Sequence, residues 1–170
     1  MGMPVSSGLV SDAMYTAGFL VYIFGIVGVT RVLYSWMRGR GLPHRVSVYY
    51  NRKVIHMLAG GVMALLTPYI FTSYLLPFSA SLLLAAILYV PHRTGRLLYW
   101  FQVEDNMFEV NFCIGWGLSL VALWVIFNDP FKAVVPAIFI AFGDAVTGLV
   151  RNTVFKRRTK HWIGNIAMLM

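Results

Sequence analysis

Long apolar runs alternate with short polar segments along the whole chain. The first run covers about residues 13–34, and the stretch from Val54 to Val90 contains no Lys, Arg, Asp or Glu. A membrane-spanning helix needs about 20 mostly apolar residues, so this second stretch is too long for one span and fits two. We therefore predict a helical hairpin there, with a tight turn within residues 67–73.

Two further apolar runs follow the polar segment 91–106. Asn128, Asp129 and Pro130 separate them and are typical of a turn. The segment 162–170 is apolar but too short to cross a membrane, so we expect a partial helix that is truncated or lies at the surface. The predicted full spans cover about residues 13–34, 54–71, 73–90, 107–127 and 131–150.

The composition supports an integral membrane protein. The chain is 59% hydrophobic and 12% charged, and its mean hydropathy is +0.71, whereas a soluble domain is about 25% charged. We predict a single all-α membrane domain over residues 1–170, a polytopic bundle of about five spans. Gly18, Gly25 and Gly28 lie in the first span, where small residues favour close helix packing.

The basic residues predict the orientation in the membrane. The net charge is +8. If the segments 35–53, 91–106 and 151–161 lie on one side of the membrane together with Arg31, that side holds 13 of the 14 Lys and Arg, and Lys132 alone lies on the other side. The positive-inside rule places these segments in the cytoplasm and the N-terminus outside. The pattern indicates a bilayer rather than nucleic acid as partner, and fits a prokaryotic plasma membrane or the endoplasmic reticulum equally.

One acid lies inside a predicted span. Asp144 is surrounded in sequence by the small residues Gly143, Thr147 and Gly148 and is followed by a basic loop. A carboxylate within a span costs about 2.5–3.5 kcal/mol on insertion scales, so such a residue usually has a function. An acid beside a basic loop at a membrane surface suggests a metal ion and a phosphate.

Two other polar clusters are predicted on the same side. Arg52 and His56 are four residues apart and share a helix face. The other cluster is Glu104, Asp105 and Glu109 near the start of the fourth span, where Asp105 and Glu109 share a face. Each residue alone has a simpler interpretation. Arg52 and Lys53 are typical lipid-headgroup contacts, His56 is typical of an interior histidine, and Glu104 and Asp105 are typical of a solvated helix start. Their convergence at one membrane face favours a functional site.

The residue types indicate phosphate chemistry. The chain has no P-loop, dinucleotide-binding or zinc motif. Carboxylates suit Mg²⁺ (or Mn²⁺), which is often held by one or two acids together with substrate phosphates. Basic side chains would stabilise the phosphate oxygens, so we expect phosphoryl or nucleotidyl transfer.

These motifs resemble those of a known family. The segment RKVIH at residues 52–56, followed by Gly60, resembles the RKxxH segment of dolichol kinase and related polyprenol kinases, which are membrane enzymes that use CTP as phosphoryl donor. The segments 143–148 and 160–164 resemble a block shared with the CDP-diacylglycerol synthases, the phosphatidate cytidylyltransferases. The chain departs from that block at His161 and Ile163, where the family has Ser or Thr and Glu.

The resemblance implies roles for individual residues. It makes Asp144 the metal-binding acid, and leaves Glu104 or Glu109 as a second metal ligand or as the base for the lipid hydroxyl. The implied catalytic residues are Asp144, His56 and Glu109. The implied substrate- and nucleotide-binding residues are Arg52, Lys53, Gly143, Gly148, Arg151, Arg158, Lys160 and Gly164.

Three functions follow as expectations. The first is CTP-dependent phosphorylation of a long-chain isoprenoid alcohol at the cytoplasmic membrane face. The second is transfer of a cytidylyl group from CTP to a lipid phosphate. The third is a non-enzymatic membrane scaffold or lipid-binding protein. A homodimer is compatible with each.

Overall fold

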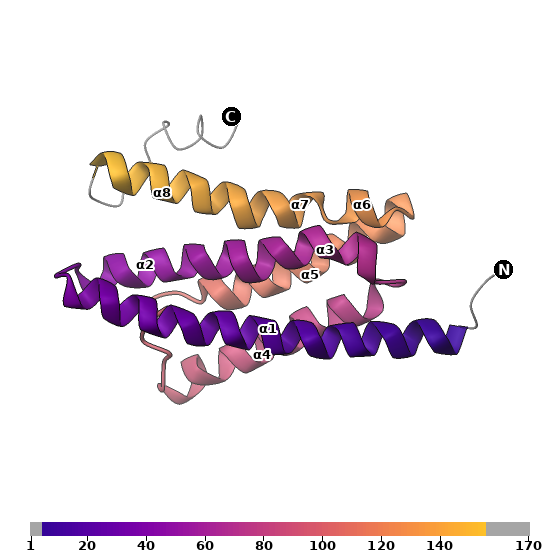
Figure 1. Ribbon diagram of the computed structural model, residues 1–170, viewed down its shortest axis with the longest axis horizontal. Coiled ribbons are helices and arrows are strands. Elements are labelled where there is room, and N and C mark those ends of the chain that lie inside the picture. Colours follow the sequence, from indigo (N-terminus) through magenta and orange to yellow (C-terminus); the bar gives the residue numbers. More distant parts are fainter. Residues whose placement is uncertain (1–4, 156–170) are drawn as a thin grey trace.

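The computed structural model describes residues 5–155, and nearly all of this range is helical (Figure 1). Within it there is no β-strand, only an isolated bridge between Val103 and Asn106. The all-α prediction is therefore confirmed. The helices are α1 (Val5–Gly39), α2 (His44–Ile55), η1 (His56–Gly61), α3 (Val62–Ile70), α4 (Leu75–Thr94), α5 (Phe108–Phe127), α6 (Pro130–Ala133), α7 (Val135–Ile138), η2 (Phe139–Gly143) and α8 (Asp144–Phe155).

Five helical stretches are long and apolar enough to cross a membrane. They match the five predicted spans, and they make the chain a multi-pass membrane protein. The second joins α2, η1 and α3 without a break, and the fifth runs from α6 into α8. The stretches are Gly8–Gly39, His44–Ile70, Leu75–Thr94, Phe108–Phe127 and Pro130–Gly148. The predicted partial helix 162–170 lies outside the described residues.

The second span begins at His44, earlier than the predicted start near residue 54. The hydropathy pattern predicts a loop for the basic residues Arg45, Arg52 and Lys53, but they lie in α2, a helix with one buried face. Asn51 is fully buried there, and its side-chain amide donates to the backbone carbonyls of Thr30 at 2.6 Å and Trp100 at 2.9 Å. The motif RKVIH therefore lies within a packed helix rather than at a helix start.

A π-helical turn, η1, follows α2 in the middle of this span. Two carbonyl oxygens of this turn accept hydrogen bonds from side chains on other helices. The Tyr22 hydroxyl donates to the Leu58 carbonyl at 3.0 Å, and the Trp116 indole donates to the Gly60 carbonyl at 3.2 Å. π-Bulges often occur at functional sites, and η1 begins at His56.

The core lies where residues of α3, α5, α6 and α7 come together. Large rings from α5 and small alanines from α3, α6 and α7 belong to the same buried cluster. The buried members are Met63, Ala64, Phe71, Trp116, Leu120, Trp124, Ala133, Val134 and Ala137.

At the opposite end from α2 and α8, the buried Asp12 carboxylate accepts from the backbone N–H and the hydroxyl of Thr72 (Figure 1). This contact fixes α1 to the predicted turn between α3 and α4.

The predicted packing role of Gly18, Gly25 and Gly28 is wrong for contacts within the described chain, because no other residue lies within 4 Å of the Cβ that any of them would carry.

Candidate functional site

Three predicted site residues meet where α2 and η1 pack against the start of α8. Lys53 Nζ forms an ion pair with Asp144 Oδ2, and His56 Nδ1 lies 3.6 Å from the same oxygen. The side chains of Lys53 and His56 are 8% and 9% exposed, whereas that of Asp144 is 53% exposed. This charged cluster (Lys53, His56 and Asp144) therefore has one open side, at the carboxylate.

Small residues on α8 make this contact possible. A Cβ on Gly148 would lie 2.8 Å from Lys53 Cε and would also clash with the Tyr49 hydroxyl. The absence of a side chain lets α8 approach α2 closely, which places Asp144, one helical turn earlier, against Lys53. Gly143 is buried at the end of η2, directly before Asp144.

The imidazole of His56 is fixed by stacking. Its ring lies 4.0 Å from the ring of Phe112 on α5, at an angle of 10°. Nδ1 faces Asp144, while Nε2 is buried and has no hydrogen-bond partner among the described residues. The Thr147 hydroxyl on α8 is also buried and has no hydrogen-bond partner among the residues that the structure describes. Buried polar atoms are nearly always hydrogen-bonded, so these atoms point to a ligand.

His56 also forms part of the wall of an apolar cavity of about 170 Å³. Side chains from α1, η1, α3, α4 and α5 line it, and nearly all of them are hydrocarbon or aromatic. Its ionisable lining groups are His56, Glu109 and the thiol of Cys113. Glu109 and Phe112 are three residues apart on α5, so the acid lies one helical turn from the ring that stacks on His56.

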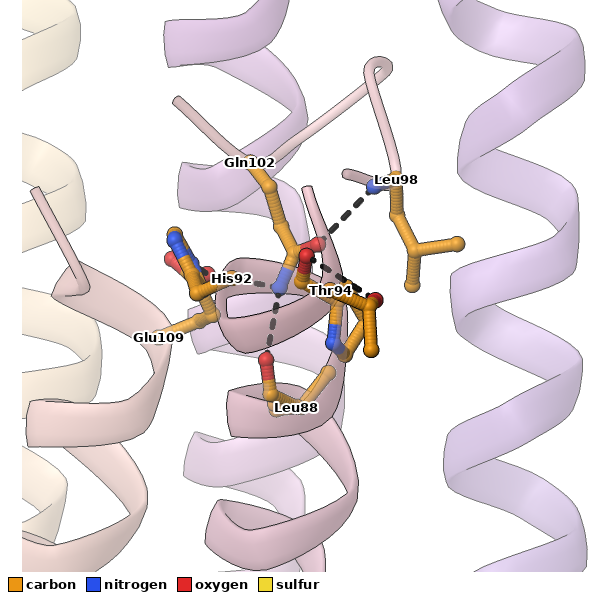
Figure 2. A network of polar contacts seen from close by, with 7 residues as sticks. Leu88, His92, Thr94, Leu98, Gln102 and Glu109 are labelled. Atoms are coloured by element: carbon orange, nitrogen blue, oxygen red, sulfur yellow. Dashed lines mark hydrogen bonds and ion pairs between the residues drawn. The ribbon is translucent and has the colours of Figure 1, made fainter. Parts of the chain in front are cut away.

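Buried contacts on one carboxylate oxygen hold Glu109 in place (Figure 2). His92 Nε2 lies 2.6 Å from Glu109 Oε1, and the side-chain amide of Gln102 donates to the same oxygen at 2.8 Å. Gln102 also donates to the Leu88 carbonyl on α4 and accepts from the Leu98 N–H. These bonds hold the loop after α4 against α4 itself. The other oxygen, Glu109 Oε2, is buried and has no hydrogen-bond partner within residues 5–155.

The predicted metal ligands are not brought together. Asp144 lies in the charged cluster, Glu109 borders the cavity, and Glu104 is exposed in the loop before α5. In residues 5–155 no three His, Cys, Asp or Glu side chains form a metal-binding group. Asp144 still fits Mg²⁺, because this ion often takes one carboxylate and completes its shell with phosphates and water. Glu109 fits poorly, because its Oε1 already binds His92 and Gln102.

The remaining predicted residues are placed as follows. The Arg52 guanidinium lies over the Phe108 ring, 4.3 Å from its centroid, and Arg151 lies in α8. Arg158, Lys160 and Gly164 lie outside the described residues.

Phe112, His92 and Gln102 contact the candidate site residues but are not among those that the sequence predicts. Phe112 could have been found from its i+3 spacing to Glu109, but His92 and Gln102 gave no signal, because their contacts join separate elements.

Comparison with known proteins gives no family. No family model matches the chain, and no curated protein or solved structure is significantly similar to it. The geometry of the charged cluster and of the cavity beside it therefore carries the functional argument.

Proposed function

We propose that the protein transfers the γ-phosphoryl group of CTP to the hydroxyl of a long-chain isoprenoid alcohol. The observation that supports this most is the position of His56. Its ring faces Asp144 and Lys53 on one side and forms part of the apolar cavity wall on the other. A water-soluble phosphate donor and a lipid acceptor would thus meet at one imidazole.

The donor would bind at the open side of the charged cluster. Lys53 supplies a buried ammonium group for phosphate oxygens, and the half-exposed Asp144 would hold Mg²⁺. When bound, the metal ion neutralises charge on the phosphates. The choice of CTP rests on the resemblance of residues 52–56 and 143–148 to the polyprenol kinases.

The acceptor would react at the end of the cavity. The alcohol oxygen forms a bond to the γ-phosphorus, the bond from that phosphorus to the bridging oxygen breaks, and CDP leaves with the electron pair. Glu109 Oε2, which has no partner in the part of the chain that the structure describes, takes the hydroxyl proton. His56, whose Nδ1 faces Asp144, donates from Nε2 to an oxygen of the phosphoryl group in transit.

This chemistry would occur on the cytoplasmic side. The helices α2 and α8, which carry Lys53 and Asp144, lie toward the end of the bundle at which α1 ends, away from the start of α1 (Figure 1). Arg38, Arg93 and Arg96 lie at or just beyond helix ends on that side. The positive-inside rule assigns such an end to the cytoplasm, where CTP is available.

The test compares two histidine variants of the purified protein. With CTP, Mg²⁺ and a polyprenol, the wild type is expected to place γ-phosphate on the lipid. His56→Gln is expected to lower the rate by about 100-fold or more, since loss of one such donor typically costs 10²–10³. His44→Gln, at an exposed histidine that contacts Tyr34, should keep the wild-type rate. Equal rates in both variants would refute the role of His56.

A further inference from the structure

One arginine lies well inside the long apolar helix α1. Arg31 precedes Gly39, the last residue of the helix, by about 12 Å along the helix axis. Its side chain is exposed, and no Asp or Glu among the described residues forms an ion pair with it. The segment 31–45 contains four Arg and no Asp or Glu. Charged side chains in membrane spans are usually paired, so this guanidinium is suited to an anion supplied by the surroundings.

Aromatic rings surround Arg31 where α1 meets the loop after α4. The Arg31 guanidinium lies over the Trp100 ring, 5.5 Å from its centroid. The Trp100 indole donates to the Val27 carbonyl at 3.2 Å, about one helical turn before Arg31. About one turn after Arg31, the Tyr34 ring packs edge to face against Tyr99, with centroids 5.5 Å apart. These four residues form an arginine–aromatic patch (Arg31, Tyr34, Tyr99 and Trp100).

Buried hydrogen bonds hold the patch in a fixed shape. The fully buried Asn51 amide donates to the Thr30 carbonyl and to the Trp100 carbonyl, so it joins the two segments that carry the guanidinium and the indole. The Tyr34 hydroxyl lies 2.8 Å from His44 Nδ1 at the start of α2. A ligand that binds a site already fixed in this way loses less free energy to the ordering of side chains.

The loop after α4 places the patch at the level of the lipid headgroups. Irregular backbone that faces lipid lies outside the hydrocarbon region of a membrane. Trp100 belongs to such a loop and contacts α1 at Val27 and Arg31, so the hydrocarbon region begins closer to the start of α1. Trp and Tyr are also enriched at the membrane–water interface. The Arg31 guanidinium therefore lies beside the lipid phosphates.

The helix surface below Arg31 can receive an acyl chain. Gly28 lies about one turn closer to the bilayer centre, is exposed, and has no other group within 4 Å of the Cβ that it would carry. Val21 lies on the same helix face two turns further along and is 75% exposed. A headgroup at Arg31 is thus followed by open space and then by an apolar surface, in the order of a phospholipid.

The chemistry of the patch favours an anionic headgroup over a zwitterionic one. Arginine binds phosphate oxygens through two parallel hydrogen bonds. A choline group would have to bind on an aromatic face, and Arg31 already lies over the Trp100 ring. A zwitterionic headgroup would also bring its cation close to the guanidinium, whereas a phosphodiester with a glycerol headgroup brings only oxygen atoms.

We propose that the arginine–aromatic patch binds the phosphate of an anionic phospholipid in the leaflet at which α1 ends. An acyl chain of this lipid lies along α1 at Gly28 and Val21. The four patch residues belong neither to the charged cluster nor to the wall of the apolar cavity. The bound lipid holds α1 against the loop after α4, and the site goes beyond the proposed function because it needs no phosphoryl transfer.

Lipid retention by the detergent-purified full chain tests the site. The probes are phosphatidylglycerol and phosphatidylcholine with identical acyl chains, added in equal amounts without CTP, Mg²⁺ or a lipid alcohol and counted by native mass spectrometry. The wild type is expected to retain phosphatidylglycerol in preference by about tenfold or more, the usual effect of one hydrogen bond to a charged group. Arg31→Gln should abolish most of this preference. Because Arg31 is exposed, its thermal unfolding in detergent alone should match that of the wild type.

Two further variants separate a specific site from general surface charge. Arg45→Gln is the matched control, because Arg45 is exposed at the start of α2 and its replacement removes the same charge; it should keep the wild-type preference. Arg31→Lys keeps the charge without the planar guanidinium, so it should also lose most of the preference. Equal preferences in Arg31→Gln and Arg45→Gln would overturn the site. A wild-type preference in Arg31→Lys would overturn the role of the guanidinium.

Discussion

Lys53 and Asp144 are 91 positions apart in the chain and form an ion pair that joins α2 to the start of α8. The pair links two spans that are also held together by the close approach at Gly148. Because Lys53 is buried and Asp144 is half-exposed, the ammonium group is held in place while the carboxylate remains open to a ligand.

Asp144→Asn is expected to abolish lipid phosphorylation while the protein still folds. The substitution removes the carboxylate that would hold Mg²⁺ and faces His56. It also leaves Lys53 without this partner, and since Asp144 is half-exposed we expect only about 1 kcal/mol of destabilisation. Transfer of γ-phosphate to lipid and thermal unfolding, measured on the same preparation, check both parts. Near-normal turnover in this variant would exclude a catalytic role for Asp144.

Gly148→Ala is expected to destabilise the contact between α2 and α8. The new methyl group would press on Tyr49 and Lys53, and overpacking of this kind costs about 1–3 kcal/mol. Gly115→Ala is the matched control, because no other group lies within 4 Å of its added Cβ. Unfolding can be followed with a fluorogenic maleimide on Cys113, the single cysteine. A Gly148→Ala protein as stable as Gly115→Ala would contradict the close approach.

The pair His92–Glu109 is expected to show strong coupling in a double-mutant cycle. Both side chains are 5% exposed, so His92→Leu removes a close partner of a buried carboxylate and leaves that oxygen less well paired, at a cost of about 1–3 kcal/mol. Removing both groups in His92→Leu/Glu109→Leu should recover a large part of that loss. Additive losses in denaturant unfolding, measured for the two single variants and the double variant, would show that the pair is not energetically coupled.

The fold was readable from the sequence because membrane spans depend on the length and apolar character of single segments. Five runs of sufficient length gave five helices, and the turn at Asn128 and Asp129 was found from residue type alone. The start of α2 was missed because its burial depends on partners in α1 and in the loop after α4, such as Thr30 and Trp100. Hydropathy within one segment does not contain that information.

Part of the candidate site could also be predicted from the sequence, because some of its residues are distinctive within a single segment. Asp144 stood out as an acid within an apolar run, and Lys53 and His56 by their spacing in RKVIH. The pairing of His92 with Glu109 depends on how α4 and α5 pack, and the apolar cavity depends on several helices together. Contacts between distant segments are set by tertiary packing, which residue spacing along one chain does not encode.

The most direct test of the central claim uses CTP labelled separately at the α and γ phosphates, with a polyprenol and Mg²⁺, and follows label into the lipid. The account predicts γ-label in the lipid, none from the α position, and loss of that signal in Asp144→Asn. Label from the α position, with a lipid phosphate as acceptor, would establish a cytidylyltransferase instead. No label from either position, together with no binding of CTP, would contradict the enzymatic account and favour a lipid-binding or scaffold protein.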